Sequence, residues 1–413
     1  MNSIYRAVSM GCIMAIAPCA SFAGIATVNG VEHETLAEAV AAVPDNGEVK
    51  LQGNVALATT LNIDKPLTIV GAGFTISAKN LGGPAIAAQN ASLRLRNLTI
   101  ATDGDGIVFA GGSDAAFSFS GDSYVLALQS CAITNTVGNA GTGVKVSGLD
   151  ERNILVGATS IASFERGLVM DESVADTRVT LYGGLDAVKP LISAKLPLFC
   201  DGRSIAFAFD NVALVATAAN SAALWFGENA VSNRVAFSGT ESSIALAGGA
   251  AGSAYLSMND ASAISSCAFG VKCSLADYNL GTEPLCEIRE PTSWRDYLAV
   301  QDAFAYAGNI SATPSVPIVR QFAAAKGTRL YATKEAAVAE ITAEDRALSI
   351  AFGEDGRPVV RLVRDADRYG VTIGIVYSGD LEADVSEWPA WSEDAVADSV
   401  PDTLFFTTVI DKD

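Results

Sequence analysis

Short runs of alternating apolar and polar residues dominate the chain between residues 48 and 285. The runs are bounded by Gly, Asn or Asp, which is typical of β-strands separated by tight corners. Clear examples are Leu67–Val70, Leu93–Arg96, Tyr124–Leu128, Arg178–Leu181 and Arg234–Phe237. The pattern therefore predicts an all-β-dominated fold of many short strands.

The runs recur with a period that predicts a solenoid. Apolar residues at comparable places follow one another roughly every 30 residues, which suits a coil of three short strands and their corners. A right-handed parallel β-helix would stack such coils, with Asn and Gly at the corners. An antiparallel sandwich, the alternative, would need longer strands and two-residue hairpins, for which the chain has few signals. The expected inward column consists of Ile100, Ile133, Ile161, Val188, Leu214 and Leu246.

A helix is expected before the first coil. Apolar residues recur on one face of the segment Thr35–Val43, and the helix breakers Pro44 and Gly47 follow it. We assign residues 24–47 to an N-terminal cap that contains this helix, and residues 48–285 to the β-helix.

The composition changes after residue 285. Residues 286–345 are interpreted as a helical linker region, in which Trp294–Tyr306 and Thr333–Ala343 have helical periodicity. Residues 346–413 alternate again and predict a small C-terminal β-sandwich-like domain. A Gly-containing turn between Leu348–Phe352 and Val359–Val363 predicts a hairpin. Val371–Tyr377 and Leu404–Val409 are the other strands expected there.

The first 23 residues have the pattern of an export signal peptide. Arg6 precedes the apolar stretch Gly11–Ala20, and Ser21-Phe22-Ala23 provides a small-x-small cleavage site before Gly24. That stretch is too short to span a bilayer. We therefore expect a secreted protein, extracellular or attached to the cell surface, without a membrane span.

Charge narrows the range of partners. The 413 residues include 46 acidic and 27 basic side chains, for a formal net charge of −19. Such a surface repels phosphate backbones, so nucleic-acid binding is not expected. The single histidine, His33, argues against a mechanism with a histidine base and against a multi-histidine metal site.

Five of the seven cysteines lie outside the export signal. Cys267 and Cys273 could close a small disulfide loop, with Cys286 as a competitor. Cys131 and Cys200 are expected to be small buried side chains rather than reactive groups.

The stretch Val28–Ser77 resembles the opening coil of pectin-lyase-like parallel β-helices, which occur in secreted and adhesin-like surface proteins of bacteria. The matching features are the helix at Thr35–Val40, the strand at Lys50-Leu51, the segment Leu61–Ile69 and the segment Gly71–Ile76. The resemblance implies that the helix covers the N-terminal end of the solenoid, where an open sheet edge would otherwise be exposed. Because folds of this kind include lyases, hydrolases, adhesins and scaffolds, the resemblance leaves the activity open.

Polysaccharide cleavage is the first enzymatic activity that this fold suggests. Polygalacturonase-type hydrolysis needs a cluster of aspartates, but the chain contains no Asp-Asp pair and no Gly-His-Gly motif. Lyase-type chemistry needs carboxylates around Ca²⁺ and a nearby Arg or Lys. The candidates are Asp103 and Asp105, in an Asp-Gly-Asp-Gly turn, and Arg94 and Arg96 on the preceding run. The alternative for the two aspartates is a structural turn, in which Asp side chains hydrogen-bond to their own backbone. Both arginines are expected at exposed positions.

Trp225, Phe226 and Tyr255 are candidates for a sugar-binding platform, because aromatic faces stack on pyranose rings; the alternative is that they pack beneath a loop. We predict a non-catalytic, adhesin-like protein that binds a polysaccharide, a cell-surface glycan or a partner protein. No catalytic residue is assigned, and Ca²⁺ is the one cofactor that the sequence suggests. The alternatives are a polysaccharide lyase or glycoside hydrolase with a non-standard site, and a structural scaffold of the cell envelope.

Overall fold

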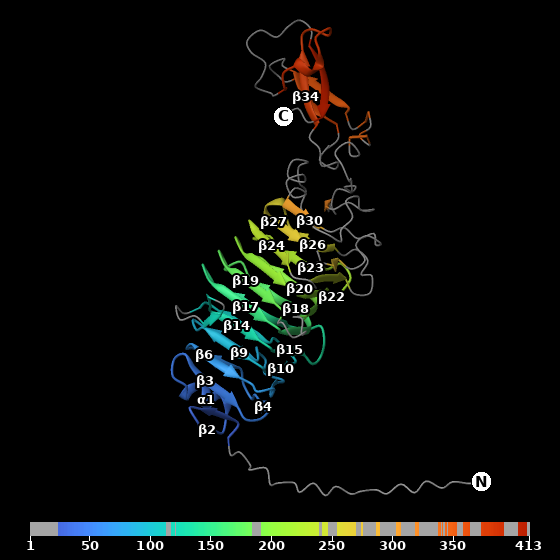
Figure 1. Cartoon of the computed structure of the whole chain (residues 1–413). Helices are drawn as coiled ribbons and strands as arrows, with labels where there is room; N and C mark the ends of the chain where they lie inside the picture. The colour runs from blue at the N-terminus through green and yellow to red at the C-terminus, as the bar shows by residue number, and fades with distance from the viewer. Residues whose placement is uncertain are drawn as a thin grey trace, which may run out of the picture.

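The computed structural model describes residues 24–112, 117–119, 121–183, 191–238, 242–246 and 254–269, followed by shorter segments that carry the remaining strands. The strands form a parallel β-solenoid of about 7 turns (Figure 1). They belong mainly to two long sheets, one of 12 strands and one of 17. The predicted parallel β-helix is confirmed, and the antiparallel sandwich is wrong for this part of the chain.

The 12-stranded sheet, sheet A, opens with antiparallel pairs and is parallel from β3 onward. Its strands, in spatial order, are β2 (Val31–His33), β1 (Ala26–Val28), β3 (Gly47–Leu51), β6 (Leu67–Val70), β9 (Leu93–Arg96), β14 (Leu126–Gln129), β17 (Asn153–Gly157), β19 (Arg178–Tyr182), β21 (Ala206–Asp210), β24 (Asn233–Ser238), β27 (Ile264–Phe269) and β30 (Phe304–Tyr306).

The 17-stranded sheet, sheet B, carries the other strands of each coil. In chain order these are β4 (Val55–Ala56), β5 (Leu61–Ile63), β7 (Thr75–Ala78), β8 (Ile86–Gln89), β10 (Thr99–Thr102), β11 (Ile107–Ala110), β15 (Ala132–Asn135), β16 (Thr142–Ser147), β18 (Ser160–Met170), β20 (Leu191–Cys200), β22 (Ala213–Ala216), β23 (Ala222–Phe226), β25 (Ser243–Leu246), β26 (Ala254–Met258), β28 (Ser274–Leu275), β29 (Cys286–Ile288) and β31 (Val319–Gln321).

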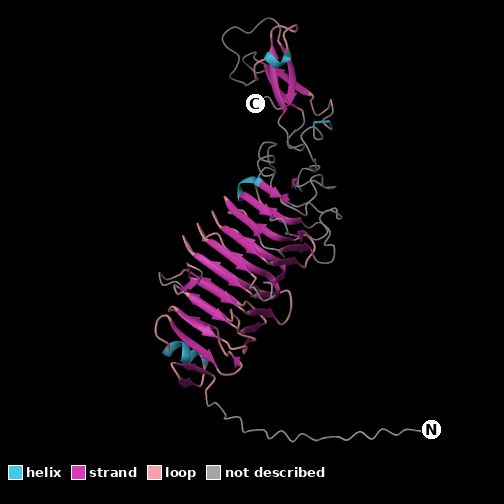
Figure 2. Cartoon of the chain, viewed as in Figure 1, coloured by secondary structure: helices cyan, strands magenta, loops and turns pink. Residues whose placement is uncertain are grey.

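The predicted N-terminal helix is present as α1 (Leu36–Ala42). Thr35 caps it: the Glu38 amide donates to Thr35 Oγ1 at 3.1 Å, and the Thr35 amide donates to Glu38 Oε2 at 3.3 Å. This reciprocal capping box satisfies two amides that the first helical turn cannot pair. The helix buries Leu36 and Val40 against the first coil, at the N-terminal end of the solenoid (Figure 2).

In-register apolar columns fill the interior. In sheet A, Leu181, Phe209, Phe237 and Phe269 occupy successive strands and are each at most 3% exposed. The Phe237 ring stacks on Phe209 with a centroid distance of 4.6 Å and on Phe269 with a distance of 5.3 Å. Aromatic stacking adds to the hydrophobic stabilisation that burial of each ring provides.

Two members of the expected inward column need correction. Ile161 pairs with Ile192, and Leu214 pairs with Ile244, so Val188 and Leu246 do not occupy the column positions. Val188 itself lies outside the described residues. The corners between strands differ in length from coil to coil, so a nearly constant residue spacing places the later positions wrongly.

The corners that follow the strands of sheet A contain residues in the left-handed backbone conformation, as predicted. Asn97 and Asn211 have φ values of 48° and 55°, and Ser130 and Ala158 occupy the same conformation with 55° and 45°. The backbone amide of Asn97 donates to the carbonyl of Gln129 in the next coil, and that of Ser130 donates to Gly157. Asn tolerates this conformation best among residues with a side chain, and each corner continues the inter-coil hydrogen bonding.

Beyond residue 285 the structure differs from the helical linker expected there. β29 pairs with β26, and β30 and β31 extend the two sheets further. Phe304–Tyr306 is a strand rather than the end of a helix, because it pairs in parallel with Cys267–Phe269 and satisfies that sheet edge. The remainder of the expected helix, from Trp294 to residue 302, lies outside the described residues.

Four strands are described near the C-terminus. β32 (Leu348–Phe352) and β33 (Pro358–Leu362) form the predicted antiparallel hairpin. β34 (Ile373–Ser378) and β35 (Phe405–Ile410) form a second antiparallel pair. No helix in the described part of the chain is long and apolar enough to cross a membrane.

Replacing Phe237 with alanine tests the importance of the aromatic column. We expect Phe237→Ala to lower the free energy of unfolding by about 3–5 kcal/mol, because it leaves a cavity between two stacked rings. Urea unfolding followed by far-ultraviolet circular dichroism measures the change. Ala236→Ser, on the exposed face of the same strand, is the matched control and should change stability by less than about 0.5 kcal/mol. Equal effects of the two substitutions would contradict the assignment.

Candidate functional site

Arg94 and Arg96 lie on the outer face of sheet A, as predicted. Both belong to β9, where Leu93 and Leu95 point inward and are fully buried. Arg96 is exposed, and Arg94 is half-buried. Residues two apart on a strand share a face and lie about 7 Å apart along the backbone, so both arginines leave β9 on the same side, and the charge of Arg96 acts on Arg94.

Arg94 is held in place by the next coil. Its Nε donates to Oε1 of Gln129 at 2.8 Å, and Gln129 is the strand neighbour of Arg96. Burial lowers the pKa of Arg94, the nearby charge of Arg96 lowers it further, and Glu48 and Tyr182 act in the opposite direction. Glu48 is itself paired with Lys50, with an Nζ–Oε1 distance of 3.4 Å.

A small hairpin forms a wall beside the two arginines. It consists of β12 (Phe117–Phe119) and β13 (Asp122–Tyr124), which are antiparallel to each other, and β13 lies against β17 on the outside of sheet A. Tyr124 of this hairpin packs with Ala127 and Leu155 of sheet A in a second hydrophobic cluster, in which each residue is at most 4% exposed. Ala127 is the strand neighbour of Arg94, so the covered area begins one strand away from that arginine.

Polar and aromatic contacts fix this hairpin. Nδ2 of Asn153 donates to the carbonyl of Ser123 at 2.9 Å. Phe119 stacks on Tyr182 with a centroid distance of 5.4 Å, and Tyr182 lies over Gly157, where a Cβ atom would collide with its ring. Gly157 is therefore required here for close approach of the ring.

We call the group Arg94, Arg96, Gln129 and Tyr182 the arginine shelf. Its guanidinium groups present N–H donors suited to carboxylates or sulfates. Its tyrosine lies three strands along the sheet from Arg96. Sequence analysis missed Gln129 and Tyr182. The signal that could have found them is their place at the ends of β14 and β19, the position that Arg96 has in β9.

The structure corrects the sugar-platform prediction. Phe226 is fully buried and Tyr255 is 2% exposed, so neither offers a ring face to a ligand. Trp225 points outward but is half-buried, and the guanidinium of Arg289 lies 4.2 Å from its ring centroid. Arg289 also donates to Ser257 Oγ at 2.7 Å. This cation–π contact ties the coil of β29 to β23 and β26, which is a structural role.

Asp103 and Asp105 serve the corners of neighbouring coils. The carboxylate of Asp103 accepts from the Asn80 amide at 2.9 and 3.1 Å, and Oδ1 of Asp105 accepts from the Thr142 amide at 2.7 Å. The two carboxylates therefore serve opposite neighbours along the solenoid axis. Among the described residues, no group of three or more His, Cys, Asp or Glu could hold a metal ion.

The described cysteines are interior residues. Cys131, Cys200 and Cys286 are buried thiols. Burial raises the pKa of Cys131 to about 11 and that of Cys200 to about 12, so both thiols are protonated at neutral pH. Cys267 is buried in β27, whereas Cys273 lies outside the described residues; the Cys267–Cys273 disulfide stays a prediction.

Comparison with known proteins finds no family model, curated protein or solved structure that matches this chain.

Replacing Asp105 tests whether it stabilises a corner or binds calcium. We expect Asp105→Ala to lower stability by about 1–2 kcal/mol, because it leaves the Thr142 amide without its acceptor. We also expect millimolar Ca²⁺ to leave the melting temperature of the wild-type chain unchanged. The exposed turn residue Asp45 provides the control substitution, Asp45→Ala. A calcium-dependent rise in melting temperature that Asp105→Ala abolishes would restore the metal-site hypothesis.

Proposed function

We propose that this chain is a secreted or surface-associated, non-catalytic β-solenoid that binds acidic polysaccharides through the arginine shelf. The observation that carries the proposal is the pair of arginines on one outer face of β9, with Arg94 oriented by Gln129. The export pattern of the first 23 residues is consistent with a role outside the cell.

An anionic ligand suits the electrostatics of the shelf. Two neighbouring cations repel each other, and the partial burial of Arg94 adds a desolvation cost. A carboxylate or sulfate bound between Arg94 and Arg96 relieves both effects through charge-assisted hydrogen bonds. Because the whole chain has a formal charge of −19, a long polyanion is attracted only locally, so binding should be moderate and sensitive to salt.

The surroundings of the shelf favour a sugar over a simple anion. Phe119, stacked on Tyr182 three strands along the sheet from Arg96, provides an apolar surface for a pyranose ring of the same polymer. Sheet A continues from β9 toward β6 and β3 on one side, whereas the hairpin of β12 and β13 stands over β17 on the other, so a linear chain would extend from the arginines toward the N-terminal coils. The combination of charge and ring surface matches a uronate polymer or a sulfated glycan.

A polysaccharide lyase is the second candidate. The specific observation in its favour is geometric: Gln129 holds Arg94 in place beside Arg96, and a lyase needs a basic side chain positioned beside the uronate carboxylate. A purely structural envelope scaffold is a third reading, in which the outer faces serve self-association.

Binding to acidic polymers tests the proposal. We expect the purified chain to bind polygalacturonate or alginate at low salt and not to bind neutral dextran. The double substitution Arg94→Ala/Arg96→Ala should weaken binding at least tenfold, about 1.4 kcal/mol. Arg234→Ala, an exposed arginine on the same face of sheet A, is the matched control and should leave the affinity within twofold. Isothermal titration calorimetry measures these affinities, and equal loss in the control would contradict the assignment.

A release assay separates binding from cleavage. We expect no soluble, unsaturated oligosaccharide after incubation with these polymers, with or without Ca²⁺. Release that Arg94→Ala alone abolishes would replace the binding proposal with the lyase.

A further inference from the structure

Two rows of outward side chains run along sheet A through the arginine shelf. Each row takes one residue from each of β3, β6, β9 and β14. The row of Arg96 consists of Lys50, Val70, Arg96 and Gln129, and the row of Arg94 consists of Glu48, Thr68, Arg94 and Ala127. A glycan chain that lies along the sheet follows these rows, so the structures at their two ends determine which part of the chain can bind.

The hairpin of β12 and β13 covers the row of Arg94 on its C-terminal side. Ala127 is the strand neighbour of Arg94, and Leu155 follows it in β17. Tyr124 of the hairpin packs with both residues, which are only 2% and 1% exposed. A strand packed on the face of a sheet lies about 10 Å above it, which is more than the thickness of a pyranose ring. No sugar can therefore follow Arg94 in this direction.

The row of Arg96 is closed one strand later. Its next members are Gln129 and Gly157, and the ring of Tyr182 lies over Gly157. Phe119 of the hairpin stacks on this ring with a centroid distance of 5.4 Å. The open part of the row thus ends at Gln129, one strand beyond Arg96.

Further contacts hold the hairpin in this position. Nδ2 of Asn153 in β17 donates to the carbonyl of Ser123 at 2.9 Å. Asp122 faces Arg178 of β19, with an Oδ2–Nη1 distance of 3.9 Å. Because both partners of this ion pair are about half exposed, it contributes little, and the buried cluster around Tyr124 supplies most of the stabilisation. The hairpin is therefore anchored to three successive strands, β14, β17 and β19.

The N-terminal side of the shelf is open. Val70 of β6 is half-buried, and Lys50 of β3 lies two strands beyond Arg96, roughly 9.5 Å away along the sheet. Nζ of Lys50 lies 3.4 Å from Oε1 of Glu48, and the two side chains are 61% and 40% exposed. Such an exposed pair is weak, so Lys50 can exchange its partner for an acidic group of a ligand at little cost.

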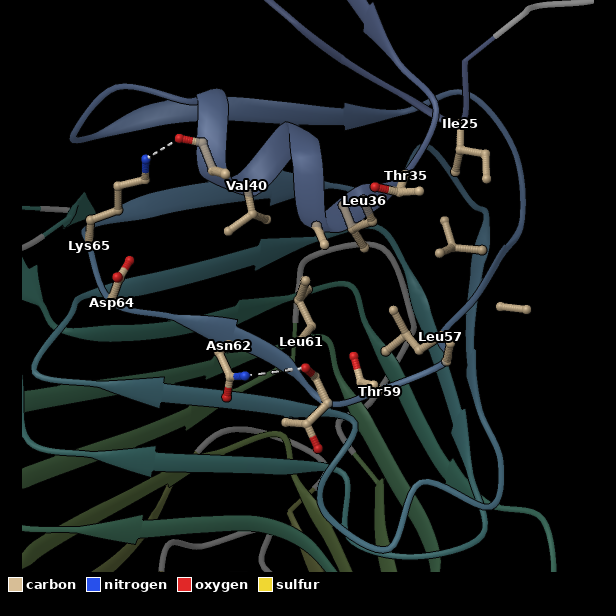
Figure 3. Close-up of a pocket in the computed structure, with 16 residues that line it drawn as sticks. Ile25, Thr35, Leu36, Val40, Leu57, Thr59, Leu61, Asn62, Asp64 and Lys65 are labelled. Carbon is tan, nitrogen blue, oxygen red and sulfur yellow. Dashed lines mark hydrogen bonds between the residues drawn. The ribbon is translucent and has the colours of Figure 1, made fainter.

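The N-terminal cap does not close this side. A cavity lies between α1 and the segment that carries β4 and β5, at the end of the solenoid (Figure 3). Lys65 at this cavity donates from Nζ to the carbonyl of Ala41 at 2.8 Å and so supports the end of the helix. The residues that line the cavity do not belong to β3, β6 or β9, and Lys50 is exposed beside the cap.

We propose that the arginine shelf binds the end of an acidic glycan chain, with the terminal sugars at Arg94 and Arg96 and the rest of the chain leading over β6 toward Lys50. This inference rests on the proposed function and names the part of the polymer that is recognised. A chain held by its internal sugars would have to continue over Ala127 and Gly157, where the hairpin and the ring of Tyr182 already lie.

The number of protein molecules bound per glycan chain tests this proposal. The probes are oligogalacturonates of six and of eighteen sugars, and isothermal titration calorimetry with the purified chain gives the stoichiometry. We expect one protein per oligosaccharide at both lengths, with dissociation constants within threefold of each other, because each chain offers one matching end. Binding to internal sugars would place several proteins on the longer chain.

Modifying the two ends of the six-sugar probe identifies the contact. Borohydride reduction opens the sugar ring at one end, and cleavage by a lyase leaves an unsaturated sugar at the other. One of these changes should weaken binding at least tenfold, and the other should leave the affinity within twofold.

Lys50→Ala tests the direction of the chain. It should weaken binding of the six-sugar probe at least threefold and leave a two-sugar probe within twofold, because the short probe does not reach β3. Lys79→Ala, an exposed lysine that follows β7 of sheet B, is the matched control and should leave both affinities within twofold.

The results separate this inference from the function on which it rests. The inference is overturned if several proteins bind one eighteen-sugar chain, or if neither end modification weakens binding. In those cases, loss of binding in Arg94→Ala/Arg96→Ala leaves the proposed function standing. If no oligosaccharide binds, or if the double substitution has no effect on binding, the proposed function fails and this inference fails with it.

Discussion

The stacking of each coil on the next, in parallel register, is the interaction on which the rest of this structure depends. Inter-coil hydrogen bonds and inward apolar columns act together: Phe209, Phe237 and Phe269 stack because their strands are paired in register. Each coil contacts mainly its neighbours, so stability is close to a sum of coil and interface contributions. The solenoid therefore needs protection mainly at its ends, and α1 and β1–β2 lie at one of them.

Because the interior is fixed by this stacking, the outward positions are free to carry function. The arginine shelf lies along one row of strand ends, in which Arg96, Gln129, Gly157 and Tyr182 follow one another from β9 to β19. The hairpin of β12 and β13 interrupts the same face and turns part of it into a wall with its own small hydrophobic cluster. A rigid sheet that holds side chains at fixed spacing is well suited to binding an extended polymer. Its side chains are already ordered, so the protein loses little conformational entropy on binding.

The fold could be predicted from the sequence because it depends on local patterns. Strand alternation, left-handed corner residues such as Asn97 and the capped helix at Thr35 are all visible in the chain. The exact register of the strands could not be predicted from the sequence, because the corners vary in length. Ile192 and Ile244 therefore occupy the inward positions that were expected for Val188 and Leu246. The helix predicted over Trp294–Tyr306 is also wrong at its C-terminal end. There Phe304–Tyr306 pairs with β27 as a strand, and this pairing outweighs the local preference for helix.

The candidate site was only partly accessible from the sequence. Arg94 and Arg96 could be placed on an outer face by alternation alone. The position of an aromatic residue in a strand does not show whether other segments pack over it. Phe226 and Tyr255 were therefore predicted to lie on the surface, although both are buried. Gln129, Tyr182 and the hairpin wall become neighbours of the arginines only through the stacking of distant coils.

A crystal structure of the chain with a short oligogalacturonate tests the central claim most directly, because it shows where an acidic glycan binds on the solenoid. The account predicts a uronate carboxylate within hydrogen-bonding distance of the Arg94 or Arg96 guanidinium, with a sugar ring beside Tyr182. An oligosaccharide bound elsewhere on the solenoid, with the arginine shelf empty, would contradict it.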